Sequence, residues 1–531
     1  MRHVRSEVSS MLRPSLLASL LVMGLAACGG APPPPAATPA PAASPAPAPA
    51  AAPAPDESFR KTPPPLGPDA VFTPPHIQEK QLPNGVRVRV VELHELPVAA
   101  IDLQFDRGAD QDKAAIGGFA GAMLLQGTKT RSALQLGDEF ERLGATEFAG
   151  VDYDSSWLVV NCLAGKLGDA LALAADVVQH PAFQKEEIER ERSHRLTAIA
   201  QQKDRPGTVL SNTVSEVLYP AGHPYASSLL GTEDEVKRAT AADFVRFHDE
   251  AFRPDRLTVT VAGDVKFDDV VAQVDKALGA WKGKAPKAKT PATPPLPKPG
   301  DARVILVDRP GATQSQIALS LVGLPRVNKD FDALTVMNTL LGGAFTSRLN
   351  LNLREAHGYT YGARSGFDFR QGPGPFTAGA AVVREKTGPA VTEILKEVER
   401  IRTEPVSDQE LTDAKAYMIR ALPARFETAE QTAGSVANLA VYGLPLDEYA
   451  TRAARIEKIT ADDVKRVAAT YLNPGAYRLV VVGDAAVVEG QLGQVGMGAV
   501  SVKKTKAAEK PEKGKAAEKP EKAKAAEKAK P

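Results

Sequence analysis

The chain has 531 residues, of which 43% are hydrophobic and 24% charged, the balance of a globular protein with room for two to four domains. Its formal net charge is only +1, and aromatic residues make up 5% of the sequence. No basic patch interleaved with aromatic side chains is present, which argues against nucleic acid as a partner.

Residues 1–27 have the pattern of a secretory signal peptide. A basic start precedes an apolar run, Ser15 to Gly24, that is too short to span a bilayer stably. The next residues, Leu-Ala-Ala-Cys, resemble a bacterial lipobox, which implies cleavage before Cys28 and lipidation of its thiol. An ordinary signal peptide with an incidental cysteine is the alternative. Because residue 29 is not the aspartate that retains lipoproteins in the inner membrane, we expect a lipid anchor in the outer membrane, facing the periplasm.

Two segments outside the main body are low in complexity. Residues 28–75 are rich in Pro and Ala and predict a semi-rigid spacer. Residues 499–531 are rich in Lys, Ala and Glu and predict a disordered tail. The formal charge is +6 on the tail and +2 on the signal segment. Since the whole chain has a formal charge of +1, residues 28–502 carry −7. Once Cys28 is acylated, the other cysteine, Cys162, has no disulfide partner and is expected to be a small buried apolar residue.

An internal repeat divides the body in two. A Pro/Lys-rich linker, residues 282–300, separates an N-terminal lobe (76–281) from a C-terminal lobe (301–498). Each lobe has a threonine with an acid three residues later, which predicts a capped helix, and then a proline, an apolar strand and a Gly-Asp step. Four pairs share one offset of 220 residues: Thr240/Thr460, Asp243/Asp463, Pro254/Pro474 and Asp264/Asp484. Matched elements at one offset indicate a duplication.

The pattern of elements predicts an α+β fold. Runs of alternating apolar and polar residues at 86–90 and 101–105 predict strands, and paired helices are expected around 171–179 and 186–202. Strands cluster and helices cluster without strict alternation. We therefore expect two homologous lobes joined as a clamshell by the linker, each a largely antiparallel sheet with helices packed on one face.

Residues 115–128 carry a family resemblance. Their sequence, Ala-Ile-Gly-Gly-Phe-Ala-Gly-Ala-Met-Leu-Leu-Gln-Gly-Thr, resembles the G-L-A-H-x-x-E-H-M-L-F-x-G-T helix of the pitrilysin/insulinase family of zinc metallopeptidases. The shared Met-Leu and Gly-Thr pairs place Gly118 and Ala122 at the two histidine positions and Gly121 at the glutamate. The family's third ligand, a glutamate on a later helix, falls on Ala198.

These replacements predict the loss of the zinc site. In the family motif, two histidines one helical turn apart bind zinc, and the glutamate is the general base. Gly and Ala side chains can neither coordinate a metal nor move a proton. No two of the eight histidines lie within five residues of each other, and His223 is expected to make a structural hydrogen bond. We therefore expect no catalytic residue, no zinc or other cofactor in this chain, and no peptidase activity from it alone.

The second half retains more of the resemblance. Residues 341–349 and 353–362 resemble the family's second-half signature, in which an arginine and a tyrosine seven residues apart hold the substrate and its intermediate. Arg354 and Tyr361 have this spacing, and both side chains can donate to a peptide carbonyl oxygen. The alternative is that Arg354 pairs with a surface carboxylate and Tyr361 packs in the core.

A chain without metal ligands but with this pair resembles the zinc-less subunit of two-chain family members. The resemblance implies a non-catalytic, substrate-binding subunit whose homologous partner carries the zinc, acting on peptides in the cell envelope. The two chains would enclose an extended peptide, which can add as a strand to a sheet edge. A non-enzymatic envelope scaffold or peptide-binding lipoprotein is the alternative, and a self-sufficient peptidase comes third.

Overall fold

The computed structural model describes residues 72–109, 114–284, 293–295 and 302–504. Contacts divide the chain into two units, Met1–Asp69 and Ala70–Pro531, and everything below concerns the second. The predicted signal peptide, Cys28, nearly all of the predicted spacer and most of the predicted tail lie outside the described residues.

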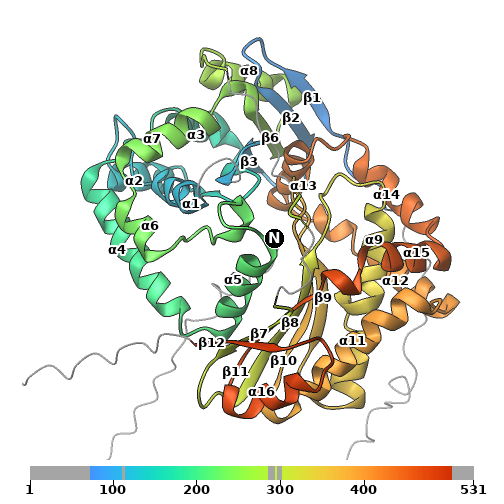
Figure 1. The fold of residues 1–531 in the computed structure, drawn as a ribbon. Coiled ribbons are helices and arrows are strands. Elements are labelled where there is room, and N and C mark those ends of the chain that lie inside the picture. The colour runs from blue at the N-terminus through green and yellow to red at the C-terminus, as the bar shows by residue number, and fades with distance from the viewer. Residues whose placement is uncertain (1–71, 110–113, 285–292, 296–301, 505–531) are drawn as a thin grey trace, which may run out of the picture. The chain divides into compact units, whose positions relative to one another are not determined.

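The first half of the unit is built on a six-stranded sheet in the order β1-β2-β6-β3-β5-β4 (Figure 1). All neighbouring strands are antiparallel except β2 and β6. The strands are β1 (Gln78–Gln81), β2 (Arg87–Glu92), β3 (Val98–Phe105), β4 (Thr146–Val151), β5 (Ser156–Leu163) and β6 (Leu257–Gly263). The helices are α1 (Ala114–Met123), α2 (Ala133–Arg142), α3 (Leu167–Gln179), α4 (Lys185–Gln202), α5 (Pro206–Leu218), α6 (Glu233–Arg238), α7 (Ala241–Ala251) and α8 (Phe267–Leu278).

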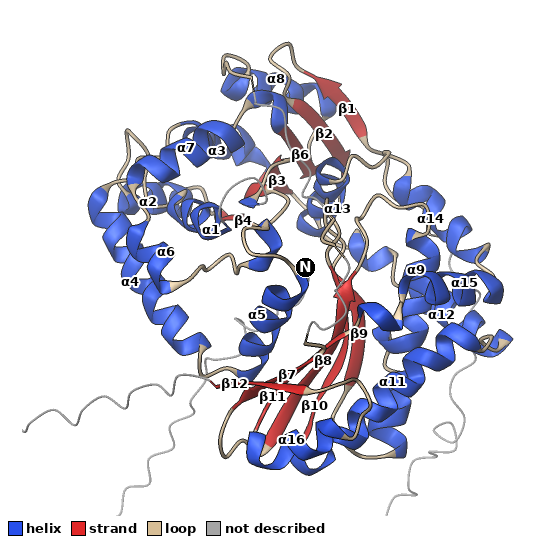
Figure 2. Ribbon diagram, in the orientation of Figure 1, coloured by secondary structure: helices blue, strands red, loops and turns tan. Residues whose placement is uncertain are grey.

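The second half repeats this plan with the sheet β12-β7-β11-β8-β10-β9 (Figure 2). Its strands are β7 (Val304–Asp308), β8 (Gln314–Val322), β9 (Ala363–Phe367), β10 (Pro375–Val383), β11 (Arg478–Gly483) and β12 (Val500–Lys504). Its helices are α9 (Phe331–Asn338), α10 (Arg348–Asn350), α11 (Thr387–Thr403), α12 (Asp408–Arg420), α13 (Ala429–Val441), α14 (Glu448–Glu457), α15 (Ala461–Tyr471) and α16 (Ala485–Gly493), with π-helical segments at Thr339–Gly343 and Leu351–Ala356.

The predicted α+β fold is confirmed, and the repeat seen in the sequence is present in the structure. Thr240 caps α7 and Thr460 caps α15, each in a reciprocal capping box with the aspartate three residues later. Each capped helix leads through a proline-containing turn into an inner strand of its half's sheet, β6 or β11. The helix cap and the inner strand that follows it therefore occur together in both halves.

The predicted end of the second lobe at residue 498 was too early. Strand β12 pairs in parallel with β7, from Val500 opposite Val304 to Lys504 opposite Asp308. The side chains of Val500 and Val502 pack against the second core. The lysine-rich composition that begins at residue 503 concealed this short strand, so the lobe extends to Lys504.

The central strands of each sheet are covered on both faces, which the sequence did not indicate. On one face lie helices of the same half, around a core that includes Ile101, Leu103 and Phe105 of β3. On the other face of β3 and β6 lies α13 of the second half, and α5 of the first half packs in turn on β8 and β11 (Figure 1). The apolar residues at the α13 contact are Val91, Ala100, Ala262, Ala433 and Val436. Those at the α5 contact are Val214, Leu218, Tyr219, Tyr225, Ile305, Ala318 and Val480.

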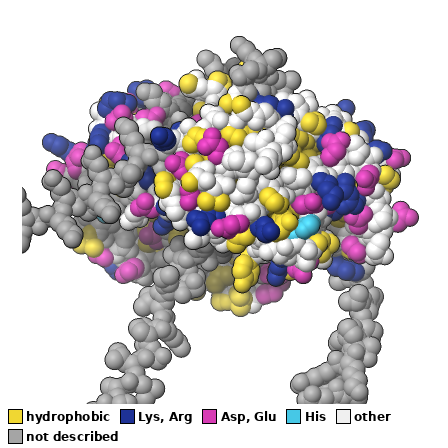
Figure 3. Space-filling model, turned by 60° about the horizontal axis from the view of Figure 1, so that its bottom comes forward, with side chains coloured by type: hydrophobic (Ala, Val, Ile, Leu, Met, Phe, Trp, Pro, Cys, Tyr) yellow, Lys and Arg dark blue, Asp and Glu magenta, His cyan; other side chains and the backbone are white. Residues whose placement is uncertain are grey.

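Cys162 on β5 is buried as predicted, and burial raises the pKa of its thiol to about 11. Within the described part of the chain, no helix is both long enough and apolar enough to cross a membrane. On the face shown in Figure 3, cationic and anionic side chains are interspersed.

Candidate functional site

The residues that replace the zinc motif lie on two neighbouring helices of the first half. Gly118, Gly121 and Ala122 are on α1, and Ala198 is on α4. Helix α1 is held against the first core by Phe119 and other apolar side chains, and it contacts α4, α7 and the outer strand β4. The predicted positions therefore do come together on helices that pack on each other.

The backbone around α1 leaves no space for a side chain at Gly118 or Gly121. A Cβ atom at Gly118 would lie 2.2 Å from the carbonyl oxygen of Leu229, and one at Gly121 would lie 2.7 Å from the backbone nitrogen of Val151. Both distances are shorter than the 3.0 Å below which a neighbouring atom must move. The segment containing Leu229 occupies the place where the first histidine would begin, so the residues present do not fit a zinc ion.

A buried guanidinium lies beside the same positions. Arg195 on α4 is 7% exposed, and it donates to the carbonyl oxygens of Leu229 (3.3 Å), Leu230 (3.4 Å) and Gly118. Its charge lies 4.9 Å from the centroid of the Phe119 ring and pairs with Glu191 at 3.3 Å. A fixed positive charge here would repel a divalent metal ion. Neither Arg195 nor Leu229 could be identified from sequence, because both act through contacts between distant segments.

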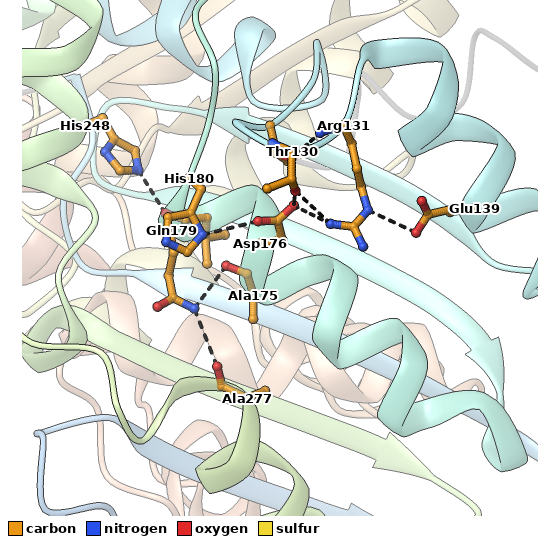
Figure 4. A network of polar contacts seen from close by, with 11 residues as sticks. Thr130, Arg131, Glu139, Ala175, Asp176, Gln179, His180, His248 and Ala277 are labelled. Atoms are coloured by element: carbon orange, nitrogen blue, oxygen red, sulfur yellow. Dashed lines mark hydrogen bonds and ion pairs between the residues drawn. The ribbon is translucent and has the colours of Figure 1, made fainter.

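The histidines near these helices have structural partners. His180 pairs with Asp176, which also accepts hydrogen bonds from Arg131 (2.8 Å) and Thr130 (3.3 Å) (Figure 4). The Nε2 atom of His248 lies 2.8 Å from the carbonyl oxygen of Val178. Burial lowers the pKa of His248, which favours the neutral ring.

His223 also has the structural hydrogen bond that was predicted. Its Nδ1 atom accepts from the backbone N–H of Tyr225 at 3.0 Å. Among the described residues, no group of three or more His, Cys, Asp or Glu side chains is arranged to hold a metal.

The predicted pair in the second half lies at the surface. Arg354 is in the π-helical segment Leu351–Ala356, with its Nε 3.3 Å from a Glu355 oxygen and its guanidinium 4.6 Å from the centroid of the Phe345 ring. Tyr361 is 94% exposed. Arg354 therefore does pair with a surface carboxylate, whereas Tyr361 does not pack in the core. Within the described residues, no hydrogen bond joins the two side chains.

Two apolar side chains that the sequence did not single out are exposed in the segments that carry and contact Arg354. Phe345 is 63% exposed and Leu351 is 46% exposed. Leu351 lies three residues before Arg354 in the same π-helical segment, and Phe345 stacks on the Arg354 guanidinium. We call Phe345, Leu351, Arg354 and Tyr361 the exposed patch. The spacing of Leu351 and Arg354 could have suggested a shared face, but exposure of apolar residues could not be predicted from the sequence.

Asn350 links the segments that carry the exposed patch. Its Nδ2 donates to the carbonyl oxygen of Phe345 at 2.7 Å, and its Oδ1 accepts from the backbone N–H of Ala363 at 3.2 Å. Gly342 allows the preceding π-helical segment to approach β9, because a Cβ there would lie 2.2 Å from the backbone nitrogen of Ser365. Short π-helical turns occur frequently at functional sites, and this region has two of them.

An ion pair connects the segment beside the exposed patch to α12. Arg348 donates to both carboxylate oxygens of Glu410, at 2.8 and 3.1 Å. Glu410 also completes the capping box of α12 with Ser407. The hydrogen bond from Arg348, aided by the backbone N–H of Ser407, outweighs desolvation and lowers the pKa of Glu410 to about 2.

Replacing Glu410 with Gln should destabilise the protein in a pH-dependent way. The folded-state pKa lies below the unfolded value, so this stabilisation is present above about pH 4.5 and is lost as the pH falls through about 2. Because the Glu410 side chain is 38% exposed, solvent screening limits the expected loss to about 1–2 kcal/mol at pH 7. Urea unfolding at pH 7 and pH 3 measures it, with the exposed Asp413→Asn on the same helix as control. Equal losses at pH 7 and at pH 3 would contradict the ion-pair explanation.

Two homologous α+β halves, with Gly and Ala where one helix pair would hold zinc, define a peptidase-like protein. Comparison with known protein families supports this classification. A family model described as Insulinase (Peptidase family M16) matches residues 87–233, and one described as Peptidase M16 inactive domain matches residues 238–418. The chain therefore belongs to peptidase family M16, the insulinase family, which confirms the resemblance seen in the sequence.

Individual relatives cover most of the chain. An uncharacterised zinc protease of Mycobacterium tuberculosis is 26% identical over 411 residues, covering 76% of this chain and 92% of that protein. One of Bacillus subtilis is 24% identical over 387 residues, covering 72% and 92%. Among solved structures, the peptidase M16 inactive domain from Pseudomonas fluorescens matches with a TM-score of 0.70 and 27% identity, covering 77% of this chain and 98% of that one.

A protease from Helicobacter pylori matches with a TM-score of 0.71 at 22% identity, covering 77% of this chain and all of that one, and this likeness shows the shared fold. Together with the Gly and Ala residues on α1 and α4, the matches fit a non-catalytic, peptidase-like member of the family.

Proposed function

We propose that this chain is the non-catalytic, substrate-binding subunit of a two-chain zinc peptidase that acts on peptides in the cell envelope. One observation carries the proposal: the backbone of Leu229 fills the space that a side chain at Gly118 would need, while Arg354 and Tyr361 remain accessible in the exposed patch. A homologous partner with an intact H-x-x-E-H helix would supply the zinc and the general base. This chain would supply donors and apolar surface for the peptide.

The chemistry of the exposed patch suits a peptide. A guanidinium and a phenol can each donate to a backbone carbonyl oxygen, and a donor of this kind placed at a developing oxyanion contributes on the order of 10²–10³ in rate. Phe345 and Leu351 offer apolar area to the substrate's side chains. Arg354 keeps a fixed orientation because it stacks on Phe345 and pairs with Glu355.

The first half offers a second feature that suits an extended chain. Strand β4 is the last strand of its sheet, and Phe148 on it is 54% exposed. An outer strand presents unpaired N–H and C=O groups to which a peptide can add as a further strand. Strand β4 also contacts α1, the helix whose counterpart carries zinc in the family motif. Attachment to the outer membrane through a lipid on Cys28 belongs to the same proposal.

Reconstitution tests the proposal directly. The purified full chain should cleave no peptide alone and should enable cleavage when a homologue bearing H-x-x-E-H is added. Arg354→Ala and Tyr361→Phe should each lower the reconstituted kcat by about 10²-fold, because each removes one donor. Tyr417→Phe, at a tyrosine that is 56% exposed on α12, is the matched control and should have no effect.

Two experimental outcomes would argue against the proposed function. Reconstituted activity that is unchanged by Arg354→Ala would remove the role proposed for the exposed patch. Stable peptide binding without any homologue-dependent cleavage would favour a non-enzymatic envelope scaffold or peptide-binding lipoprotein, for which addition of the peptide to the outer strand β4 would be sufficient.

A further inference from the structure

The loop between β9 and β10, residues 368–374, is seated against the first half. The backbone N–H of Gly372 donates to the Tyr225 hydroxyl at 3.1 Å, and the Tyr219 hydroxyl donates to the carbonyl oxygen of Pro373 at 2.9 Å. The Gln371 side chain donates to the carbonyl oxygens of Asp154 (3.3 Å) and Val441 (3.1 Å). These bonds join segments that are far apart in sequence and belong to both halves.

A buried carboxylate lies at the centre of this contact. Asp154, in the loop between β4 and β5, is 1% exposed. It accepts hydrogen bonds from the Gln371 backbone N–H (2.9 Å), the Tyr225 hydroxyl (3.1 Å) and the Tyr442 hydroxyl (3.3 Å). Gln371 and Tyr442 belong to the second half and Tyr225 to the first, so this one carboxylate holds both halves.

The charged groups around Asp154 leave its charge poorly compensated. Asp152 is half-buried in the same loop and accepts from the backbone N–H groups of Asp154 and Ser155. Arg370 is the cation packed here, but it pairs with Asp368 at 2.6 Å and stacks on the rings of Tyr153 and Tyr225. The remaining titratable side chains packed here are Tyr219, which donates to Pro373, and His223, which stacks on Tyr225.

Burial raises the pKa of Asp154, the negative charge of Asp152 raises it further, and the Gln371 N–H and Arg370 only partly oppose them, so the value reaches about 6. A protonated Asp154 has a good partner for its new O–H. It can donate to the Tyr442 hydroxyl, which can then donate to the carbonyl oxygen of Phe369, 3.4 Å away. Both protonation states therefore have partners, but the neutral one avoids a buried charge for which the described residues provide no ion pair within 4.0 Å.

We propose that Asp154 and the 368–374 loop form a proton-operated latch between the two halves, which tightens when the carboxyl group takes up a proton and loosens when it is released. The folded-state pKa is raised above the ordinary 3.8, so the tight state is fully favoured below about pH 4 and is lost as the pH rises through about 6. A difference of about two pKa units corresponds to as much as about a 100-fold change in the closing equilibrium. This inference does not depend on the proposed peptidase partnership.

Hydrogen exchange across the 368–374 loop tests the latch in the full chain. After correction for the intrinsic pH dependence of exchange, protection of the Gln371 and Gly372 amides should fall by about 10-fold between pH 5 and pH 8. Asp154→Asn mimics the neutral acid and should keep the pH 5 level of protection at pH 8. Asp264→Asn, at an exposed acid of the first half, should retain the native pH dependence.

A second variant keeps the test decisive if Asp154→Asn folds poorly. Asp152→Asn retains an oxygen for the Asp154 and Ser155 N–H groups but removes the neighbouring negative charge, so the midpoint should move below pH 6. Protection that is constant from pH 5 to pH 8 in the native protein would overturn the proposal. So would an unshifted midpoint in Asp152→Asn, or a native-like pH dependence in Asp154→Asn.

Discussion

Restoring the four lost residues as G118H/G121E/A122H/A198E is expected to give a less stable protein that still fails to bind stoichiometric zinc. The first histidine would have to begin 2.2 Å from the Leu229 carbonyl oxygen, and the glutamate 2.7 Å from the Val151 backbone nitrogen. Backbone atoms cannot rotate away as a flexible side chain can, so the surrounding segments must shift. The buried guanidinium of Arg195 would also face any metal that entered.

The expected cost can be measured one position at a time. Inserting atoms into a packed site typically costs about 1–3 kcal/mol, so Gly118→Ala and Gly121→Ala should each lose about that amount in urea unfolding. Gly434→Ala is the matched control: it is also a helical glycine, but a Cβ there would meet nothing within 4 Å. That variant should gain about 0.5–1 kcal/mol, because Ala is the better helix former.

Metal analysis of the fourfold variant completes this test. One zinc per chain together with native or higher stability would show that the space beside α1 is available after all. Loss of stability without bound zinc is the expected result. Adding Arg195→Met separates the two causes, because it removes the charge but leaves the Leu229 backbone in place.

The sequence was sufficient for what depends on local chemistry. The capping pairs at Thr240 and Thr460 and the constant offset between the halves predicted both the repeat and the α+β class, since capping and periodicity act over a few residues. The identities of Gly118 and Ala198 are enough to exclude them as metal ligands, because neither side chain carries a donor atom. This conclusion about the two residues does not depend on the tertiary contacts of α1 and α4.

The rest depends on contacts between distant segments. Arg195 is an ordinary charged residue of a helix in the sequence, and only the approach of Leu229 and Gly118 makes it a buried cation. The exposure of Tyr361 likewise follows from how its segment leaves Asn350 and enters β9. Strand β12 was missed because its pairing with β7 spans the whole second half, while its composition is that of the basic tail.

Placing a charge on α13 should unfold the sheet of the other half as well as its own. Val436 is fully buried and packs against Val91, Ala100 and Ala262, all of which belong to the first half. Val436→Asp should lower the free energy of unfolding by about 3–5 kcal/mol, because a buried charge would lack a partner. Val436→Ala, which removes only two methyl groups, should cost about 2 kcal/mol. Gly434→Asp, at an exposed position of the same helix, should change stability by less than about 0.5 kcal/mol.

The strands that lose protection from hydrogen exchange show whether the two halves stabilise each other or are each stable alone. If α13 completes the first sheet, Val436→Ala should increase hydrogen exchange in β3 and β6, although the substitution lies in the second half. The reciprocal change, Val214→Ala on α5, should increase exchange in β8 and β11. Exchange that increases only within the mutated half would mean that each half is stable alone. Because each sheet depends on a helix supplied by the other half, we expect a single cooperative unfolding transition rather than two.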